Sequence, residues 1–160
     1  MNKRERISDF VRELDPAASP REGQDYYRAF FRLWNAQRYY EAHDVLEQLW
    51  LAEKDKALAR FYQGLIQAAG AFVHLQKNFE HPTHAKHGRR IRPATRLFTL
   101  ALKNLEHVPD VFRSLDTRKF RELLVATRDD IIAADYEKNP FSPETAPLVS
   151  LHLQRKGERG

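Results

Sequence analysis

Apolar residues recur at helical spacing along most of this chain, and no segment shows the strict alternation of a half-buried strand. Helices are predicted at about residues 23–37, 39–53, 56–78 and 93–107, and a fifth is predicted to begin after Asp116 or Thr117. The very short connection between the first two favours an antiparallel hairpin. At 160 residues the chain has the length of one domain. The pattern therefore predicts an all-α, single-domain antiparallel helical bundle of about five main helices.

The two ends of the chain are expected to differ from the helical bundle, which spans residues 23–138. Residues 1–22 carry many charges and two prolines, which predicts a flexible N-terminal arm with at most a short helical turn. Residues 139–160 contain three prolines, and the residue before a proline avoids the helical conformation. An extended C-terminal tail that lies over the bundle is therefore predicted here.

The composition excludes several classes of protein. The chain has no cysteine, which rules out a disulfide scaffold, a thiol nucleophile and a zinc site built on cysteine. Residues 1–10 lack the apolar core of a secretory signal, and no apolar run is long enough for a membrane span. We therefore expect a soluble, cytoplasmic protein without a membrane partner. The sequence also lacks a glycine-rich phosphate loop, a Gly-x-Ser-x-Gly elbow and a dinucleotide-binding fingerprint.

Polar residues lie on or beside the apolar stripes of the helices predicted at 39–53 and 56–78. In the first helix, His43 falls inside the stripe, and Glu47, four residues on, falls at its edge. In the second helix, three polar residues share one line. A polar group in a helix interface needs a partner, because burying it unpaired is costly. The two helices are therefore predicted to enclose a polar pocket formed by His43, Glu47, Arg60, Gln67 and His74.

Three interpretations of this polar pocket stay open on the sequence alone. In a structural network, Arg60 neutralises Glu47, and the remaining polar groups complete the hydrogen bonds. In a binding pocket, the same groups meet a small molecule or an anion. In a metal or acid/base site, His43, Glu47 and His74 hold zinc or iron, or exchange a proton with a substrate. The His-x-x-x-Glu spacing lacks the second histidine of the His-Glu-x-x-His zinc motif and does not decide among them.

A basic segment lies between residues 81 and 105, which contain six Lys or Arg and no Asp or Glu. Because the net charge of the whole chain is +5, the rest of the chain is close to neutral. The basic segment 86–103 is therefore a candidate surface for an anion or a nucleic-acid backbone, and a solvated helix face is the alternative. The candidate anion-binding residues are Arg89, Arg90, Arg92 and Arg96.

Three histidines, His81, His84 and His87, recur at every third position in the loop before the fourth predicted helix. Their side chains meet on one face if this loop forms a helical turn, and a transition metal would then bind weakly there. A solvated loop is the alternative interpretation.

Two short segments carry a specific pattern: EAHDVLE at residues 41–47, followed by Trp50, and QGLIQ at residues 63–67. The pattern resembles the family called domain of unknown function 309, and the resemblance covers roughly residues 26–105. This chain departs from the family in having Asp44 where glutamate is usual. It also has a longer loop rich in His and Arg where the family has a short Gly-Asn-type turn. The resemblance implies a small, mostly helical bundle, and it implies no activity because the family has none assigned.

We therefore expect a helical binding or interaction module of unknown activity, with its functional surface beside the predicted polar pocket. One alternative is a metal-dependent or acid/base enzyme that uses His43, Glu47 and His74. The other is a nucleic-acid or anion binder that uses the basic segment 86–103. The sequence identifies no cofactor and no particular partner.

Overall fold

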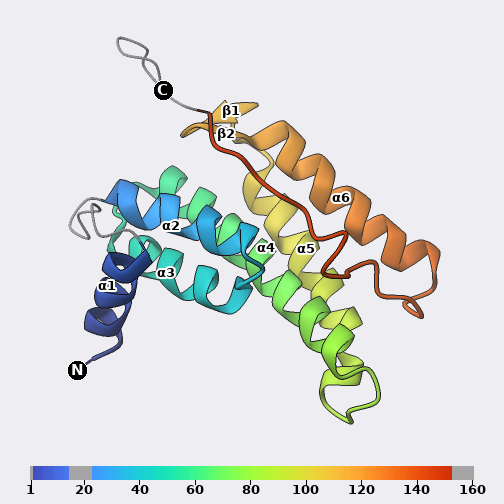
Figure 1. Ribbon diagram of the computed structural model, residues 1–160. Helices are drawn as coiled ribbons and strands as arrows, with labels where there is room; N and C mark the ends of the chain where they lie inside the picture. The colour runs from blue at the N-terminus through green and yellow to red at the C-terminus, as the bar shows by residue number, and fades with distance from the viewer. Residues whose placement is uncertain (1, 15–22, 153–160) are drawn as a thin grey trace.

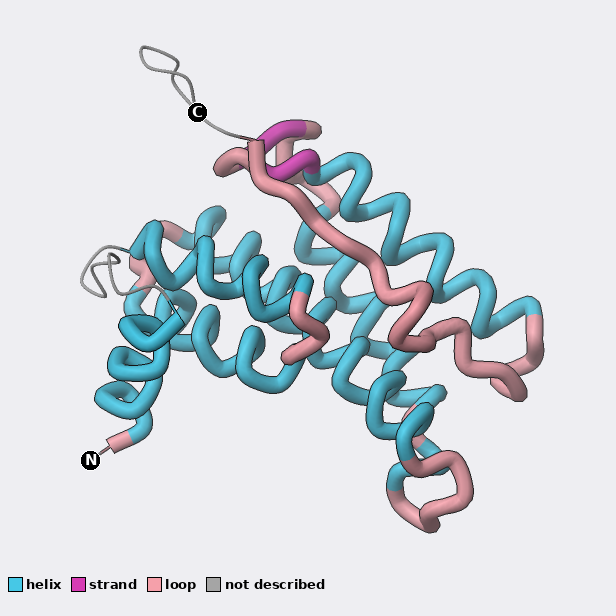
Figure 2. The backbone as a smooth tube through the Cα atoms, in the orientation of Figure 1, coloured by secondary structure: helices cyan, strands magenta, loops and turns pink. Residues whose placement is uncertain are grey.

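The computed structural model describes residues 2–14 and 23–152 of the chain (Figure 1). The predicted all-α class is confirmed, because helices dominate and the strands in this part of the chain form one small hairpin (Figure 2). The helices are α1 (Lys3–Leu14), α2 (Gly23–Asn35), α3 (Tyr39–Ala52), α4 (Lys56–Glu80), α5 (Ile91–Leu105) and α6 (Thr117–Ala133), with a 3₁₀ turn at His87–Arg89. The hairpin pairs β1 (Val111–Phe112) antiparallel with β2 (Leu115–Asp116). None of the helices in these residues is long and apolar enough to cross a membrane.

Local chemistry fixes where three of the helices begin. Asp55 Oδ1 accepts a hydrogen bond from the backbone N–H of Leu58 at 3.1 Å and caps α4. Asp116 Oδ1 accepts from the backbone N–H of Lys119 at 2.9 Å and caps α6, as the sequence predicts. In α5, Pro93 lies in the first turn, where its missing N–H leaves no helical hydrogen bond unmade.

Helix α4 is the centre of the fold, with the α2–α3 pair packed on one side and the α5–α6 pair on the other (Figure 1). A Cβ added to Gly64 of α4 would lie 2.8 Å from Cγ of Leu105 and 3.3 Å from the carbonyl oxygen of Ala101. Helices α4 and α5 therefore approach each other too closely at this position for any side chain other than hydrogen.

Aromatic rings fill the core between these helices. The ring of Phe72 in α4 lies 5.0 Å from that of Trp34, 5.3 Å from that of Tyr39 and 5.4 Å from that of Phe98. Trp34 also lies 5.4 Å from Phe120 of α6. All five side chains are buried. One aromatic cluster thus joins α2, α3, α4, α5 and α6.

The N-terminal segment contains more helix than the sequence predicts, because residues 3–14 form the full helix α1 rather than a short turn. Ile7 and Val11 of α1 are buried in the core, with 7% and 1% of their surface exposed. The guanidinium of Arg38 lies 4.9 Å from the ring centre of Phe10 and adds a cation–π contact. The rest of the predicted arm lies outside the described residues.

Residues 139–152, called the C-terminal strap below, run back from the end of α6 to the β-hairpin without regular secondary structure (Figure 2). Asn35 of α2 makes two hydrogen bonds to the backbone of Val149: Nδ2 donates to its carbonyl oxygen at 2.7 Å, and Oδ1 accepts its N–H at 2.8 Å. Trp34 Nε1 donates to the carbonyl oxygen of Pro147 at 3.1 Å. The strap is therefore fixed to α2 through its backbone. The remainder of the predicted tail lies outside the described residues.

Candidate functional site

The polar line of α4 faces α5, and not the helix at 39–53 as the sequence pattern predicts. Arg60 Nε donates to Oδ1 of Asn104 at 3.3 Å, and Nδ2 of Asn104 donates to Oε1 of Gln67 at 2.7 Å. The cause is Gly64, which lies on the same line and admits α5 to close contact. A line of residues that includes the contact point with α5 must face α5 along its length.

The two α3 residues of the predicted pocket lie near α1 instead. Lys3 Nζ donates to Oε1 of Glu47 at 3.0 Å and lies 3.6 Å from Oδ1 of Asp44. Nδ1 of His43 lies 3.3 Å from the same oxygen of Asp44. The hydrogen bond to Glu47 raises the pKa of Lys3. Glu47 therefore pairs with Lys3 and not with Arg60, its partner in the structural-network interpretation.

The three residues considered as metal ligands do not converge. His43 and Glu47 lie beside α1, whereas His74 contacts Arg90 at the start of α5. Across residues 2–14 and 23–152, no group of three or more His, Asp or Glu side chains has the geometry to hold a metal ion. The five residues of the predicted pocket thus belong to three separate clusters, and the one around His74 joins the basic segment.

Arg90 is the centre of a hydrogen-bonded cluster at the end of the α4–α5 hairpin. Its Nη1 lies 3.0 Å from Nδ1 of His74, and its Nε donates to Nδ1 of His87 at 2.8 Å. A guanidinium carries only donors, so both imidazoles accept through Nδ1. In the neutral ring the proton then resides on Nε2, which acts as a donor.

His84 adopts the same tautomer for a different reason. Its Nδ1 accepts hydrogen bonds from the backbone N–H groups of Lys86 and His87, at 3.1 and 3.2 Å. Its ring stacks on that of His87 with the centroids 4.6 Å apart, and the ring of His81 lies 5.6 Å from that of His87. The three loop histidines thus gather, but the Nδ1 lone pairs of two of them are occupied. Rings in this state present N–H donors, which suit an anion better than a metal ion.

The surroundings of these histidines are positively charged. Burial lowers the pKa of His74, and the charges of Arg90 and Arg96 lower it further. Desolvation lowers the pKa of His87, and the four neighbouring groups that add to this shift are all basic. No carboxylate of the described residues contributes to either shift. The cluster therefore lies in an electrostatic field of one sign.

The four arginines predicted to bind an anion have no carboxylate partner within the part of the chain that the structure describes. Arg92 lies 4.1 Å from the ring centre of Tyr136 in a cation–π contact, and Arg89 is exposed. Arg92 and Arg96 are four residues apart on α5 and share its exposed face, and the charge of Arg96 reaches His74. These groups form one surface, called the basic end below: His74, His84, His87, Arg89, Arg90, Arg92 and Arg96.

A buried asparagine fixes the loop that carries the basic end. Asn78 is 7% exposed and donates to the carbonyl oxygens of His87 and Gly88, at 3.4 and 3.1 Å. Its own Oδ1 accepts a hydrogen bond from Asn139 of the strap at 3.0 Å. A Cβ on Gly88 would lie 2.6 Å from the carbonyl oxygen of Pro82, so only glycine fits there. Asn78 is not among the site residues predicted from the sequence, although an amide on the apolar face of a long helix indicates a polar partner.

The resemblance to a known family is confirmed over part of the chain. The family model described as Domain of unknown function (DUF309) matches residues 27–84, which include α3 and α4 and end in the histidine loop. An uncharacterised protein of Aquifex aeolicus (strain VF5) is 28% identical over 91 residues, which are 57% of this chain and 24% of that protein. The chain thus spans about a quarter of the length of this curated relative. No solved structure matches the chain.

Proposed function

We propose that this protein is a helical binding module for a phosphate-bearing anion and that the basic end is its binding surface. The observation that carries the proposal is the pair of hydrogen bonds from Arg90 to His74 and His87. These bonds leave each imidazole with an Nε2–H donor beside a guanidinium that keeps its charge. Ionised phosphate oxygens accept hydrogen bonds and donate none, so they match a set of donors without acceptors.

The electrostatics of the basic end favour a ligand over a purely structural role. Arginines and lysines without carboxylate partners repel one another and lower the stability of the unliganded protein. Desolvation lowers the pKa values of His74 and His87, and the same positive field lowers them further. An anion bound at this surface relieves the repulsion, and its binding therefore stabilises the folded protein.

Titration of the protein with inorganic phosphate tests the proposal. We expect the side-chain nitrogen resonances of His87 and Arg90 to shift together and to saturate in NMR spectra. The melting temperature should rise with the phosphate concentration. Arg90→Met should weaken phosphate binding by about tenfold or more, because it removes charge-assisted hydrogen bonds.

Arg118→Met is the matched control, because Arg118 is an exposed arginine on α6 that lies 3.7 Å from a carboxylate oxygen of Glu122. Its phosphate affinity should equal that of the wild-type protein. Equal binding by the Arg90 and Arg118 variants, or an absence of saturable shifts at His87, would refute the proposal.

A nucleic-acid backbone is the second anion that the basic end is suited to meet. The supporting observation is the spacing of Arg92, Arg96 and Lys103 along the exposed face of α5. In this case a single-stranded oligonucleotide should bind more tightly than inorganic phosphate, and its affinity should fall steeply as salt is raised. Oligonucleotide binding that does not change between low and moderate salt would exclude this alternative.

A further inference from the structure

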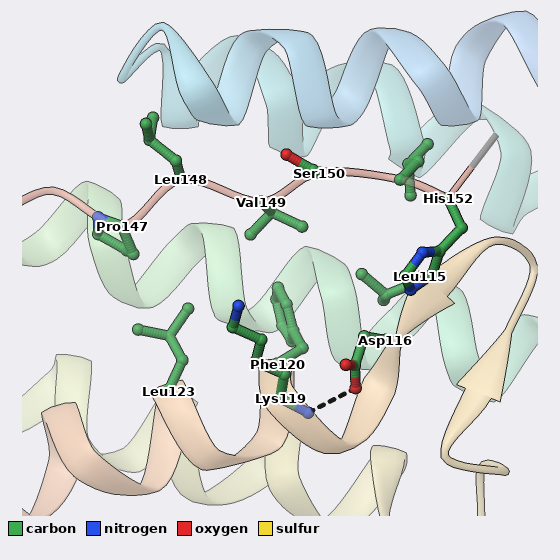
Figure 3. Close-up of a pocket in the computed structure, with 11 residues that line it drawn as sticks. Leu115, Asp116, Lys119, Phe120, Leu123, Pro147, Leu148, Val149, Ser150 and His152 are labelled. Carbon is green, nitrogen blue, oxygen red and sulfur yellow. Dashed lines mark hydrogen bonds between the residues drawn. The ribbon is translucent and has the colours of Figure 1, made fainter.

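A separate cavity lies between the C-terminal strap and α6, near the β-hairpin (Figure 3), at the end of the molecule away from the α4–α5 loop (Figure 1). Its volume is about 420 Å³, which is within the range of small-molecule sites. The walls come from three parts of the fold: the first turns of α6, strand β2, and residues 147–152 of the strap.

The strap, which forms one wall of this cavity, is held by hydrogen bonds to α2 and to the turn of the β-hairpin. Asn35 and Trp34 of α2 bind the backbone of the strap, and the N–H of His152 donates to the carbonyl oxygen of Ser114 at 2.7 Å. These bonds fix the strap at both ends of the cavity. The cavity is therefore largely formed before a ligand arrives, which reduces the entropy lost on binding.

Most of the lining is apolar. Phe120 of α6 and Val149 of the strap are buried, and their side chains face each other across the gap in Figure 3.

Two basic side chains reach the cavity from different walls. Lys119 extends from α6 toward the strap, and His152 extends from the strap toward β2 (Figure 3). Neither side chain has a hydrogen-bond or ion-pair partner in residues 2–14 and 23–152. Asp116 also lines the cavity, and its Oδ1 accepts the backbone N–H of Lys119 as the cap of α6. The basic groups therefore favour one negative charge, while the carboxylate of Asp116 opposes a second.

We infer that this cavity binds a small amphipathic carboxylate of the medium-chain fatty-acid class. Its alkyl chain lies against the apolar lining between the strap and α6, and its carboxylate meets Lys119 at the exposed rim. Burial of the alkyl chain supplies most of the affinity, and the charge-assisted contacts at Lys119 select the carboxylate. A phosphate dianion is disfavoured by Asp116, so this cavity differs in chemistry from the basic end. The inference therefore does not rest on the function proposed for the basic end.

Titration of the full chain with octanoate, with octanol as the uncharged comparison, tests the inference. Trp34 reports occupancy, because its ring lies 5.4 Å from Phe120 and its Nε1–H donates to the strap at Pro147. We expect both ligands to shift the indole N–H resonance of Trp34 and octanoate to bind about tenfold more tightly than octanol. Lys119→Gln should abolish this preference and leave octanol binding unchanged.

Two further variants separate loss of the site from loss of the fold. Leu123→Trp should fill the cavity and prevent binding of both ligands, and its helical circular dichroism should match that of the wild-type protein. Lys138→Gln, which changes an exposed lysine beyond the C-terminal end of α6, should bind octanoate as the wild-type protein does. Equal affinities of the wild-type protein for octanoate and octanol would overturn the inference. The inference would also be overturned if sedimentation detected a dimer and dimer formation, without ligand in the cavity, accounted for the shift of the Trp34 resonance.

Discussion

Tyr39 is fully buried, and its hydroxyl has no hydrogen-bond partner in the described structure. Burial also raises the pKa of this hydroxyl. Tyr39→Phe removes the unpaired polar atom and keeps the ring contacts with Trp34 and Phe72. We therefore expect this substitution to raise the free energy of unfolding by about 1 kcal/mol.

Urea unfolding followed by circular dichroism measures this change at Tyr39. Tyr40→Phe is the matched control, because Tyr40 is 63% exposed and its substitution should change the stability by less than about 0.5 kcal/mol. A loss of stability in Tyr39→Phe would mean that a buried water molecule satisfies the hydroxyl, and the prediction would be wrong.

Glu47 carries a second prediction at the scale of one residue. A buried pair with Arg60, which is one interpretation of the sequence, would make removal of Glu47 cost about 3–5 kcal/mol. In the structure Glu47 pairs with Lys3, whose side chain is 47% exposed. Glu47→Ala should therefore lower the free energy of unfolding by less than about 1 kcal/mol, the range of exposed ion pairs. A double-mutant cycle with Lys3→Ala measures the pair, and a coupling of several kcal/mol would contradict its exposed setting.

At the scale of secondary-structure elements, the contact between α4 and α5 depends on one glycine. Gly64→Ala places a methyl group 2.8 Å from Cγ of Leu105, and overpacking of this kind costs about 1–3 kcal/mol. Gly70→Ala meets only Cδ1 of Leu97 at 3.2 Å, at the end of a side chain that can move. It should gain up to about 1 kcal/mol, because alanine favours the helix over glycine.

The two glycine substitutions are chemically identical and lie in the same helix, so each is a control for the other. Thermal unfolding should show a lower melting temperature for Gly64→Ala and an equal or higher one for Gly70→Ala. Stabilisation by both variants would show that α4 and α5 are farther apart at Gly64 than the structure indicates.

The main helices could be predicted because each repeats its apolar spacing over several turns. The β-hairpin could not be predicted, because strands of two residues are too short to show alternation. Its turn residues Arg113 and Ser114 have positive φ angles of 47° and 65°, whereas Asn or Gly usually mark such a turn. Gly64 indicated a close neighbour of α4, but the sequence did not say that this neighbour is α5.

At the scale of the whole molecule, both candidate sites depend on contacts between distant segments. Arg90 contacts His74, which is 16 residues away, and the strap accepts a hydrogen bond from Trp34, which is 113 residues away. Helical periodicity reports only neighbours one or two turns apart, so neither contact could be predicted from it. The charge of the basic segment could be predicted because composition alone determines it.

Proton binding by His74 links the basic end to the stability of the whole fold. Its pKa in the folded protein lies below the ordinary value of about 6.5, because of burial and then the charges of Arg90 and Arg96. Above pH 6.5 the imidazole is neutral in both the folded and the unfolded chain. As the pH falls below about 6.5, the unfolded chain takes up the proton first, and the free energy of unfolding decreases. The decrease continues until the pH falls below the lowered pKa of the folded state.

His74→Gln should reduce this pH dependence and leave the part that comes from the lowered pKa of His87, because glutamine accepts the hydrogen bond from Arg90 through Oε1 and does not titrate. The loss in the wild-type protein is at most about 1.4 kcal/mol per pH unit for one proton. Urea unfolding between about pH 5 and 7 measures it before most carboxylates titrate. His107→Gln is the control, because the His107 side chain is 80% exposed, and this variant should keep the wild-type slope. If His74→Gln also kept that slope, another group would cause the loss, and His74 would not be the residue through which acid destabilises the fold.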